Sequence, residues 1–322
     1  MVYKNIFYLV TFKKKSGGSL YGRYISNIKE VKTHYLLNSQ SKNKIVKLVV
    51  YFIKLFKFHL FKKSRDIIIY NQDNCFFLQN QDKNILLTHH YHPVSKNILI
   101  RYYQIFLHKN ILKNKDKIDL LVVVSEFWKH YYSNLGFANI KVIYNPFEMS
   151  LYKQRTFDEK VAFKKKYNLE NKPIVYLGNP QREKGTDKAY NALKNLDVHL
   201  VTTGIKTLDL PVKHLELSFE EYILLLQVAD VSVLMSQIKE GWNRVAHESL
   251  LCKTPVVGTG FGGMGELLIK SQQTICQDFT ELAEKVSEIL MRKQKVTDEA
   301  LAYVYSFTQE KFENSWKEVL EI

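Results

Sequence analysis

The chain has 322 residues, of which 46% are hydrophobic and 25% are charged, enough apolar material for two globular domains of ordinary size. No stretch approaches the roughly 18 uninterrupted apolar residues of a transmembrane helix, so we expect a protein that does not span a bilayer. Residues 1–15 lack the basic-then-apolar order of a signal peptide. The three widely spaced cysteines, Cys75, Cys252 and Cys276, form no disulfide framework and lack the spacing of metal ligands, so we expect a reducing cytoplasm.

The net charge of +15 is concentrated in the first half of the chain. Residues 1–150 contain 24 Lys and Arg against 8 Asp and Glu, a net charge of +16, whereas residues 151–322 contain 23 against 24. This asymmetry predicts that the first half faces an anionic surface, either a membrane leaflet or nucleic acid. A general lysine bias would raise the lysine content everywhere, so it does not explain the whole difference.

Short runs of apolar and β-branched residues predict the strands of the first half. We expect them at 6–11, 31–36, 66–70, 84–88, 120–125 and 141–144. Ser125 is the expected N-cap of a helix that starts at Glu126. Gly17 and Gly18 form a predicted turn before a helix that begins near Leu20. Such a pair lets backbone amides approach a phosphate or sugar, although glycine pairs more often only turn the chain.

Residues 44–63 predict a helix with one basic and one apolar side. Its lysines fall within roughly 140° of the helical wheel, opposite a wide apolar face. The lysines are Lys44, Lys47, Lys54, Lys57 and Lys62, and the apolar residues are Ile45, Val49, Phe52, Ile53, Phe56 and Leu60. This arrangement predicts contact with an anionic membrane surface. The alternative is a helix that buries its apolar face against its own sheet.

Three histidines follow the predicted strand that ends at Thr88, namely His89, His90 and His92. Alternating positions on an extended chain without convergent carboxylates make a weak metal site, so we expect no metal here. A histidine at the end of a strand is better suited to a polar or acid–base contact with a ligand.

Pro146 ends the last strand of the first half, so we place the first domain at residues 1–148. The second domain should contain strands at 174–177, 198–202, 214–217, 228–235 and 254–258, with a helix at 220–227. The loop after the strand at 174–177 is rich in glycine and contains Arg182 and Lys184. Backbone amides and a lysine in such a loop can neutralise a diphosphate.

Glu240 and Glu248 lie eight positions apart between two predicted strands. Gly241 can open a helix, which would place Glu240 at its mouth and Glu248 about two turns deeper on the same face. Ligands of open parallel sheets bind at the carboxyl ends of strands, where Glu240 would lie. An isolated pair of glutamates would more often be solvated. The flanking apolar strands and the Gly262–Gly263 turn favour a site.

Three segments together resemble the signature of the retaining family 4 glycosyltransferases of the GT-B fold. They are Glu240-Gly241-Trp242 with the seven residues that separate Glu240 from Glu248, Thr254-Pro255-Val256-Val257, and Gly262-Gly263-Met264-Gly265-Glu266. The fixed spacings make the resemblance specific. It implies an α/β protein of two Rossmann-like domains with parallel sheets facing across a cleft. An acceptor-binding domain would comprise residues 1–148, with helix 306–322 crossing back to it, and a nucleotide-sugar-binding domain residues 149–305.

The resemblance also implies roles for individual residues. Glu248 would hold the ribose hydroxyls and Glu240 a hydroxyl of the transferred sugar, while Lys184 stabilises the leaving diphosphate. His90, in Thr88-His89-His90, would contact the donor sugar. Further donor-binding residues would be Gly17, Gly18, Arg182, Asn243, Arg244, Gly262 and Gly263. The family usually has Arg at the position of Asn179, and either Arg182 or Arg244 could supply the missing charge.

The sequence therefore predicts a retaining hexosyltransferase that moves a sugar from a nucleotide-sugar to a glycan or lipid-linked acceptor, in bacterial surface polysaccharide or lipopolysaccharide synthesis. Because the chain has no Asp-x-Asp motif, we expect metal-independent transfer with no cofactor. The expected location is the cytoplasmic face of the cell membrane, with no nucleic acid bound.

Three alternatives stay open at this point. A GT-B nucleotide-sugar epimerase would need no acceptor surface. A nucleic-acid-binding protein would use the basic half, with Tyr51 and Phe58 stacking on bases. An inactive homologue is suggested by Asn179.

Overall fold

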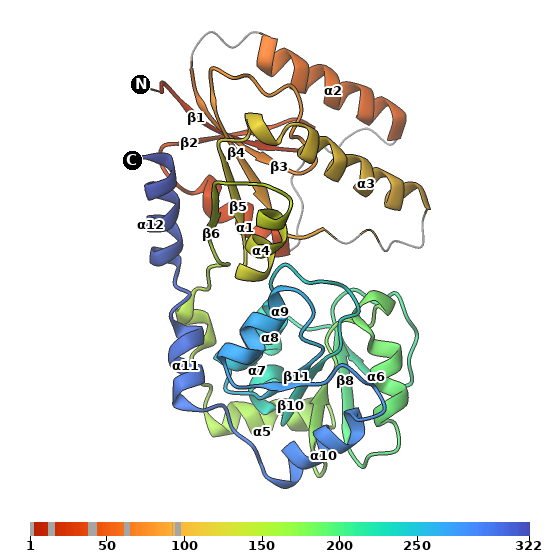
Figure 1. Cartoon of the computed structure of the whole chain (residues 1–322). Coiled ribbons are helices and arrows are strands. Elements are labelled where there is room, and N and C mark those ends of the chain that lie inside the picture. Colours follow the sequence, from red (N-terminus) through yellow and green to blue (C-terminus); the bar gives the residue numbers. More distant parts are fainter. Residues whose placement is uncertain (1–2, 12–16, 38–43, 61–64, 92, 94–97) are drawn as a thin grey trace. The chain divides into compact units, whose positions relative to one another are not determined.

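The computed structural model divides the chain into two compact units (Figure 1). The first unit comprises residues 1–146 and 309–322, and the second comprises residues 147–308. The structure describes residues 3–11, 17–37, 44–60, 65–91, 93 and 98–322. The predicted boundaries at 148 and 305 differ from these borders by a few residues. His92 and Lys62 lie outside the described residues.

The first unit is built on a sheet of six parallel strands in the order β2-β1-β3-β4-β5-β6. The strands are β1 (Ile6–Val10), β2 (Val31–Tyr35), β3 (Ile67–Asn71), β4 (Lys83–Thr88), β5 (Leu120–Val123) and β6 (Ile140–Val142). Ile6 lies opposite Val31 on one side and Ile67 on the other. All six predicted strands of this half are confirmed, because short β-branched runs between turn residues are typical of buried parallel strands.

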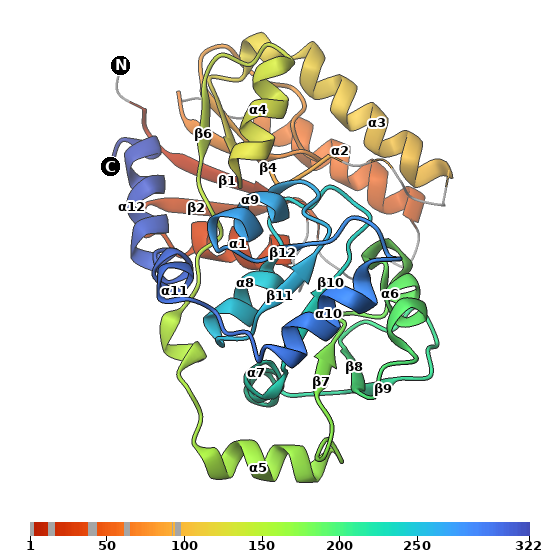
Figure 2. The ribbon, with the colours of Figure 1, turned by 60° about the horizontal axis from the view of Figure 1, so that its bottom comes forward.

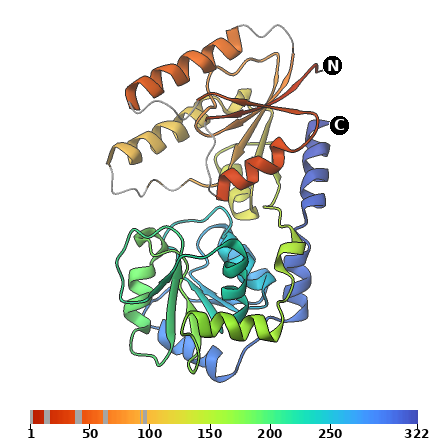
Figure 3. The same ribbon diagram turned by 180° about the vertical axis from the view of Figure 1, so that it is seen from behind.

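Helices cover both faces of this sheet (Figures 1 and 3). They are α1 (Gly17–Ser26), α2 (Lys44–Leu60), α3 (Ile98–Lys113), α4 (Glu126–Asn134) and α12 (Gln309–Leu320), with a short 3-10 turn at Lys115–Lys117. On one face, Tyr21 of α1 packs edge-on against Phe312 and Trp316 of α12. On the other, α2, α3 and α4 share a core with Leu9 and Leu86 of the strands.

One local prediction for the first unit is wrong, and a second, the N-cap at Ser125, is confirmed in its position only. The helix expected near Leu20 begins at Gly17, so Gly17 and Gly18 form its first turn instead of a preceding loop. Ser125 occupies the N-cap position of α4, but its side chain makes no capping hydrogen bond and its hydroxyl is buried.

The second unit has its own sheet of six parallel strands, in the order β12-β11-β10-β7-β8-β9. The strands are β7 (Ile174–Tyr176), β8 (His199–Thr203), β9 (Lys213–Leu215), β10 (Val231–Leu234), β11 (Val256–Gly258) and β12 (Thr274–Ile275). Counted within the unit, this is the 3-2-1-4-5-6 order of a Rossmann fold. The strand order reverses between β7 and β10, where such sheets open a crevice for ligands.

The second unit contains α5 (Phe157–Lys166), α6 (Thr186–Leu193), α7 (Phe219–Val228), α8 (Arg244–Leu251), α9 (Gly263–Lys270), α10 (Leu282–Met291) and α11 (Asp298–Tyr305). Short 3-10 turns lie at Met149–Tyr152 and Arg182–Lys184. Capping boxes fix the start of α5, through Thr156 and Glu159, and of α7, through Ser218 and Glu221. Figure 2 shows these helices around the strands of the unit.

Helix α2 forms as predicted, but a different side of it packs on the sheet. Tyr51, Leu55 and His59 are buried, whereas residues of the predicted apolar face, such as Val49 and Phe56, are about half exposed. The alternative in which that face is buried against its own sheet is therefore wrong. Along the described parts of the chain, no helix combines the length and apolarity needed to cross a bilayer.

Candidate nucleotide-sugar site

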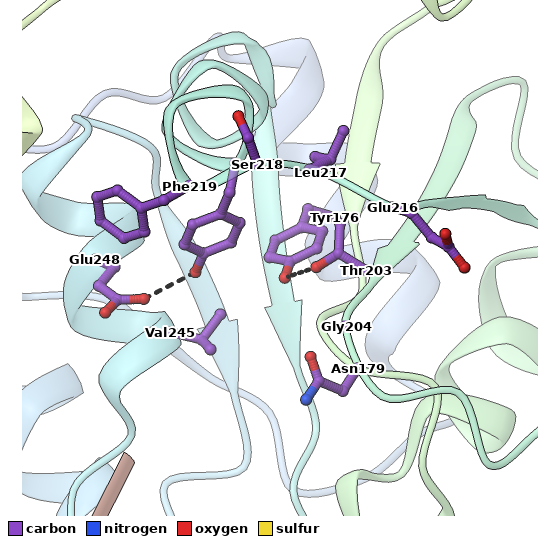
Figure 4. A pocket seen from close by; sticks show the side chains of 11 residues that line it. Tyr176, Asn179, Thr203, Gly204, Glu216, Leu217, Ser218, Phe219, Val245 and Glu248 are labelled. Atoms are coloured by element: carbon purple, nitrogen blue, oxygen red, sulfur yellow. Dashed lines mark hydrogen bonds between the residues drawn. The ribbon is translucent and has the colours of Figure 1, made fainter. Parts of the chain in front are cut away.

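A pocket of about 820 Å³ lies in the second unit, at the carboxyl ends of its central strands. The residues that line it end β7 and β8, follow β7, β8 and β9, or belong to α7 and α8 (Figure 4): Tyr176, Asn179, Thr203, Gly204, Glu216, Leu217, Ser218, Phe219, Tyr222, Val245 and Glu248. This is the edge at which Rossmann sheets bind ligands. Aromatic rings and two carboxylates dominate the lining, and none of the lining residues is Arg or Lys.

Glu248 presents its carboxylate to the pocket from the second turn of α8. Tyr222 donates a hydrogen bond to Oε2 at 2.9 Å and Tyr152 one to Oε1 at 3.3 Å. The Arg244 guanidinium lies 3.4 Å from Oε1. Burial raises the pKa of both tyrosines, and the nearby carboxylate adds to this effect. Both hydroxyls therefore stay protonated as donors, which holds the carboxylate in one orientation.

The opposite wall contains Tyr176 and Thr203, whose hydroxyls lie 2.7 Å apart (Figure 4). Beside them the amide of Asn179 packs on Gly204, where a Cβ would come within 2.5 Å of Oδ1. Asn179 thus lines the pocket at the position where the family usually has Arg. Arg182 is exposed, and Arg244 is the arginine that contacts a pocket carboxylate.

A second polar cluster connects the loop after β7 with the loop after β10, the two strands between which the strand order reverses. Lys184, after β7, donates to Oε1 of Glu240 at 2.6 Å, and Ser236, after β10, donates to the same oxygen at 2.7 Å. Glu240 is 8% exposed. The loops approach closely at Gly185, whose φ is 67° and where a Cβ would lie 2.2 Å from the Met235 carbonyl. Lys184 and Glu240, which the sequence analysis singled out separately, thus form an ion pair with each other.

Glu240 is also tied through its backbone to the start of α9. It forms an isolated β-bridge with Gly262, and its carbonyl accepts from the Gly263 amide at 2.8 Å. Gly262 has a φ of 71°, and a Cβ there would lie 2.3 Å from the Glu240 carbonyl oxygen. Only glycine fits this position. The Gly262–Gly263 pair therefore sets where Glu240 lies.

The helix that carries Glu248 begins later than predicted. Asn243, and not Gly241, precedes its first turn, and the Asn243 side chain accepts from the Ala246 amide at 3.0 Å. Glu248 is therefore little more than one turn from the helix start. Asn243 also donates to Sδ of Met264 at 3.3 Å, so both ends of its amide make contacts within the protein.

The remaining predicted site residues lie in the first unit. His90 follows β4, is exposed, and accepts from Gln72 through its carbonyl oxygen at 3.1 Å. His89 packs edge-on against Tyr21. Gly17 and Gly18 open α1. Lys44, Lys47, Lys54 and Lys57 lie along α2. Their functional roles stay predictions.

Sequence reasoning missed several residues of the second unit. His247 stacks on Phe147 with ring centroids 3.9 Å apart, accepts from Trp242 and contacts the Val304 carbonyl at 3.0 Å. Tyr152 and Tyr222 hold Glu248, yet neither lies in a recognisable motif. A tyrosine outside a motif gives no sequence signal, because only the fold brings it to its partner.

Residues 157–301 match the model of the family described as glycosyl transferases group 1. These residues are a group 1 glycosyltransferase domain. The pocket, Lys184, Glu240 and Glu248 all fall inside it. The match covers most of the second unit and none of the first.

Two relatives contain stretches that are similar to part of this chain. An uncharacterized glycosyltransferase of Methanocaldococcus jannaschii, MJ1178, is 27% identical over 40% of this chain and 44% of its own length. The putative glycosyltransferase YtcC of Bacillus subtilis is 25% identical over 59% of this chain and 56% of its own. The chain spans about half the length of the curated relatives it matches.

A solved structure, Anabaena Alr3699/HepE in complex with UDP and glucose, is similar with a TM-score of 0.78. The comparison covers 98% of this chain and 99% of that one at 17% identity. The same Anabaena protein has been solved with UDP-glucose. This likeness confirms the GT-B class of fold, two Rossmann-like domains, that the sequence predicted.

No group of three or more His, Cys, Asp or Glu side chains that could hold a metal ion occurs within the described ranges.

Proposed function

We propose that the protein is a retaining glycosyltransferase of family 4 that uses a nucleotide-sugar donor. The observation that carries this proposal is the pocket at the carboxyl ends of β7, β8 and β9, inside the group 1 domain, with Glu248 held at its wall. A carboxylate with fixed orientation can accept two hydrogen bonds from a vicinal diol, which is the pattern of a ribose.

The nucleoside part of the donor fits the pocket better than the diphosphate does. The lining combines aromatic rings with the carboxylates of Glu216 and Glu248 and has no basic side chain. Two carboxylates would repel a diphosphate, whereas they accept hydrogen bonds from a base or a ribose. The diphosphate therefore belongs towards Lys184, whose side chain is about one-third exposed.

In this arrangement Glu240 binds a hydroxyl of the transferred sugar. The ion pair with Lys184 and the bond from Ser236 hold its carboxylate before the donor arrives. Lys184 is then placed to stabilise the charge that builds on the leaving diphosphate. The positive end of the α9 dipole, at the Gly262–Gly263 turn, would add to this stabilisation.

The transfer breaks the bond between the anomeric carbon and the diphosphate oxygen and forms a bond from the acceptor oxygen on the same face. The acceptor proton passes to the departing phosphate, so no protein nucleophile is needed. With Lys184 and helix N-termini stabilising the leaving group, we propose that transfer needs no metal. The proposed acceptor is a glycan or a lipid-linked glycan of bacterial surface polysaccharide or lipopolysaccharide synthesis, reached at the inner face of an anionic membrane.

A thermal-shift screen against UDP, GDP, ADP, CMP and their common sugar conjugates tests the donor site, since a ligand of the folded state raises Tm. UDP is the first candidate, because the similar Anabaena protein binds it. We expect one nucleotide family to raise Tm, and Glu248→Gln to abolish the shift because one of the two accepting oxygens becomes an NH2 group, which donates and cannot accept from a diol hydroxyl.

Glu183→Gln is the matched control, since Glu183 is exposed in the neighbouring loop and does not line the pocket. It should leave the shift unchanged. A wild-type protein that no nucleotide stabilises, or a Glu248→Gln variant that binds as the wild type does, would contradict the proposed donor site. Sugar transfer that persists in EDTA supports metal independence, and transfer restored only by added Mg²⁺ or Mn²⁺ contradicts it.

A further inference from the structure

The first unit exposes a continuous apolar surface formed by two helices. Figures 1 and 3 both show α2 and α3 side by side over the same sheet. More than half of the large apolar side chains that are exposed in the described ranges lie on these helices or at Phe77 between them. Scattered exposed apolar residues need no explanation, but a contiguous group of this kind marks an interaction site.

Helix α3 contributes as many exposed apolar residues to this surface as α2 does, and its contribution was not anticipated from the sequence. Only Leu107, His108 and Ile111 of its sixteen residues are buried, all in the second half. The exposed apolar residues of the first half are Ile98, Leu99, Ile100, Tyr102 and Tyr103, with Phe106 directly after them, and Leu99 reaches 75% exposure. The same segment contains Arg101 and Gln104, but so many large apolar side chains exposed close together are unfavourable in water.

Contacts between aromatic rings connect the apolar surfaces of the two helices. Phe56 of α2 contacts Phe77 at a centroid distance of 5.7 Å, and Phe76 stacks on Phe106 of α3 at 6.2 Å. Phe52 contacts the other edge of Phe76 at 5.5 Å. These contacts connect the exposed apolar residues of α2 and α3, together with Phe77, into one surface, which we call the α2–α3 face.

The charges of the α2–α3 face identify its partner. Helices α2 and α3 contain Lys44, Lys47, Lys54, Lys57, Arg101, Lys109 and Lys113 and no acidic residue. The sequence has no Asp or Glu between Glu30 and Asp66 or between Asp82 and Asp116. Asp66 and Asp116 are the acidic residues nearest to α2 and α3 in the sequence, and Asp73 lies in the loop before Phe76. A second copy of this chain would bring like charges together, whereas an anionic bilayer offers both opposite charge and an apolar interior.

We propose that the α2–α3 face docks on an anionic phospholipid bilayer, and that the first half of α3 is the part that enters the acyl region. Lysines of α2 and Arg101 would then lie at the headgroups, where long basic side chains extend from an apolar surface. This inference deepens the proposed function, because it specifies how an enzyme with a membrane acceptor reaches it. Unlike the membrane contact expected from α2 alone, it assigns the penetrating role to α3.

Nucleic acid fits this face less well. Tyr51, one of the two rings considered for base stacking, is buried, and its hydroxyl donates to the Asp73 carbonyl. The exposed side chains of α3 include three aliphatic ones, which do not stack on bases.

Co-sedimentation of the full chain with vesicles tests the proposal. Vesicles of 30% phosphatidylglycerol in phosphatidylcholine are compared with pure phosphatidylcholine, at low salt and at high salt. We expect binding to the anionic vesicles. The triple variant L99S/Y102S/F106S should bind at least tenfold more weakly at both salt concentrations, because it loses apolar insertion. Lys54→Gln with Lys57→Gln should weaken binding mainly at low salt, where charges are little screened.

The matched control is F157S/I269S/M291S, which removes three comparably exposed apolar residues of the second unit. It should bind vesicles as the wild type does. Absence of wild-type binding to anionic vesicles, or undiminished binding by the α3 triple variant, overturns the proposal. A wild-type dimer that the α3 variant converts to a monomer would show a subunit interface, and binding of single-stranded RNA through this face would also overturn the proposal.

The experiment separates this inference from the donor site. Vesicle binding is measured without nucleotide, and the UDP-dependent thermal shift is measured on the same α3 variant. We expect that shift to be intact, since no α3 residue lines the pocket. Loss of vesicle binding with an intact shift supports membrane docking through α3. An absent nucleotide shift in the wild type would contradict only the donor site.

Discussion

At the scale of single residues, the second unit depends on contacts that link distant parts of its sequence. His247 is the clearest case: its Nδ1 accepts from Trp242 at 3.2 Å, so the proton lies on Nε2, which donates to the Val304 carbonyl at 3.0 Å. Both nitrogens of a neutral imidazole are thus used. Phe147 stacks on one face of the ring and Phe307 meets it edge-on.

This environment predicts a stability that depends on pH. Burial lowers the pKa of His247 to about 3 from 6.5. Below pH 6.5 the unfolded chain binds a proton that the folded chain refuses, so the free energy of unfolding falls as pH falls from about 6.5 towards 3. His247→Gln, which keeps a donor and an acceptor but does not titrate, should remove this contribution. Urea unfolding at pH 7.5 and pH 5 measures it, and an equal pH slope in the variant would contradict the assignment.

At the scale of elements, helix starts determine where the acidic residues lie. Glu248 lies on α8, whose start is fixed by Asn243. Glu240 is held by the bridge to Gly262 at the start of α9. Neither position follows from helical periodicity alone. Helix α2 shows the same limit, because its periodicity identifies residues that share a face but not which face the sheet covers.

Gly262→Ala tests the coupling between α9 and Glu240. The φ of 71° is unfavourable for alanine, and the new Cβ would lie 2.3 Å from the Glu240 carbonyl oxygen. We expect a loss of roughly 2–3 kcal/mol in unfolding free energy, together with weaker donor binding, because the loop must move. Gly136→Ala is the control: its φ is also positive, at 86°, but the Cβ would meet only the mobile end of Lys115. Equal losses in the two variants would show that backbone strain, and not contact with Glu240, sets the cost.

At the scale of the whole molecule, the first unit is assembled from two distant parts of the sequence. Its sheet comes from residues 1–146, and α12 comes from residues 309–322. Trp316 of α12 is fully buried and Phe312 nearly so, and Lys83 forms an ion pair with Glu321 at 2.5 Å. The last helix is thus part of the core of the first unit.

Trp316→Ala should therefore destabilise the first unit, although the substitution lies near the end of the chain. A cavity of this size in a core costs about 3–5 kcal/mol, and Trp316→Phe, which fills most of the space, should cost much less. Hydrogen exchange read segment by segment should show faster exchange in β1 and β3. Unchanged exchange there, with a loss of protection confined to α12, would mean that α12 does not stabilise the sheet.

The sequence by itself determined every described strand except the two-residue β12, the Rossmann-like class of the two domains and the pair of segments that contain Glu240 and Glu248. Buried parallel strands are short apolar runs, and the spacing of the glycines and glutamates is local along the chain. These features need no knowledge of distant contacts.

Only the tertiary structure decided which side chains meet. Tyr152 and Tyr222 reach Glu248 across 96 and 26 positions of sequence, and Lys184 reaches Glu240 across 56. The exposure of the first half of α3 is likewise evident only from the tertiary structure, because apolar composition does not tell whether other elements of the protein pack over a helix. Pairing across such separations depends on strand order and loop geometry, since these set which side chains come within contact distance, and local patterns do not contain that information.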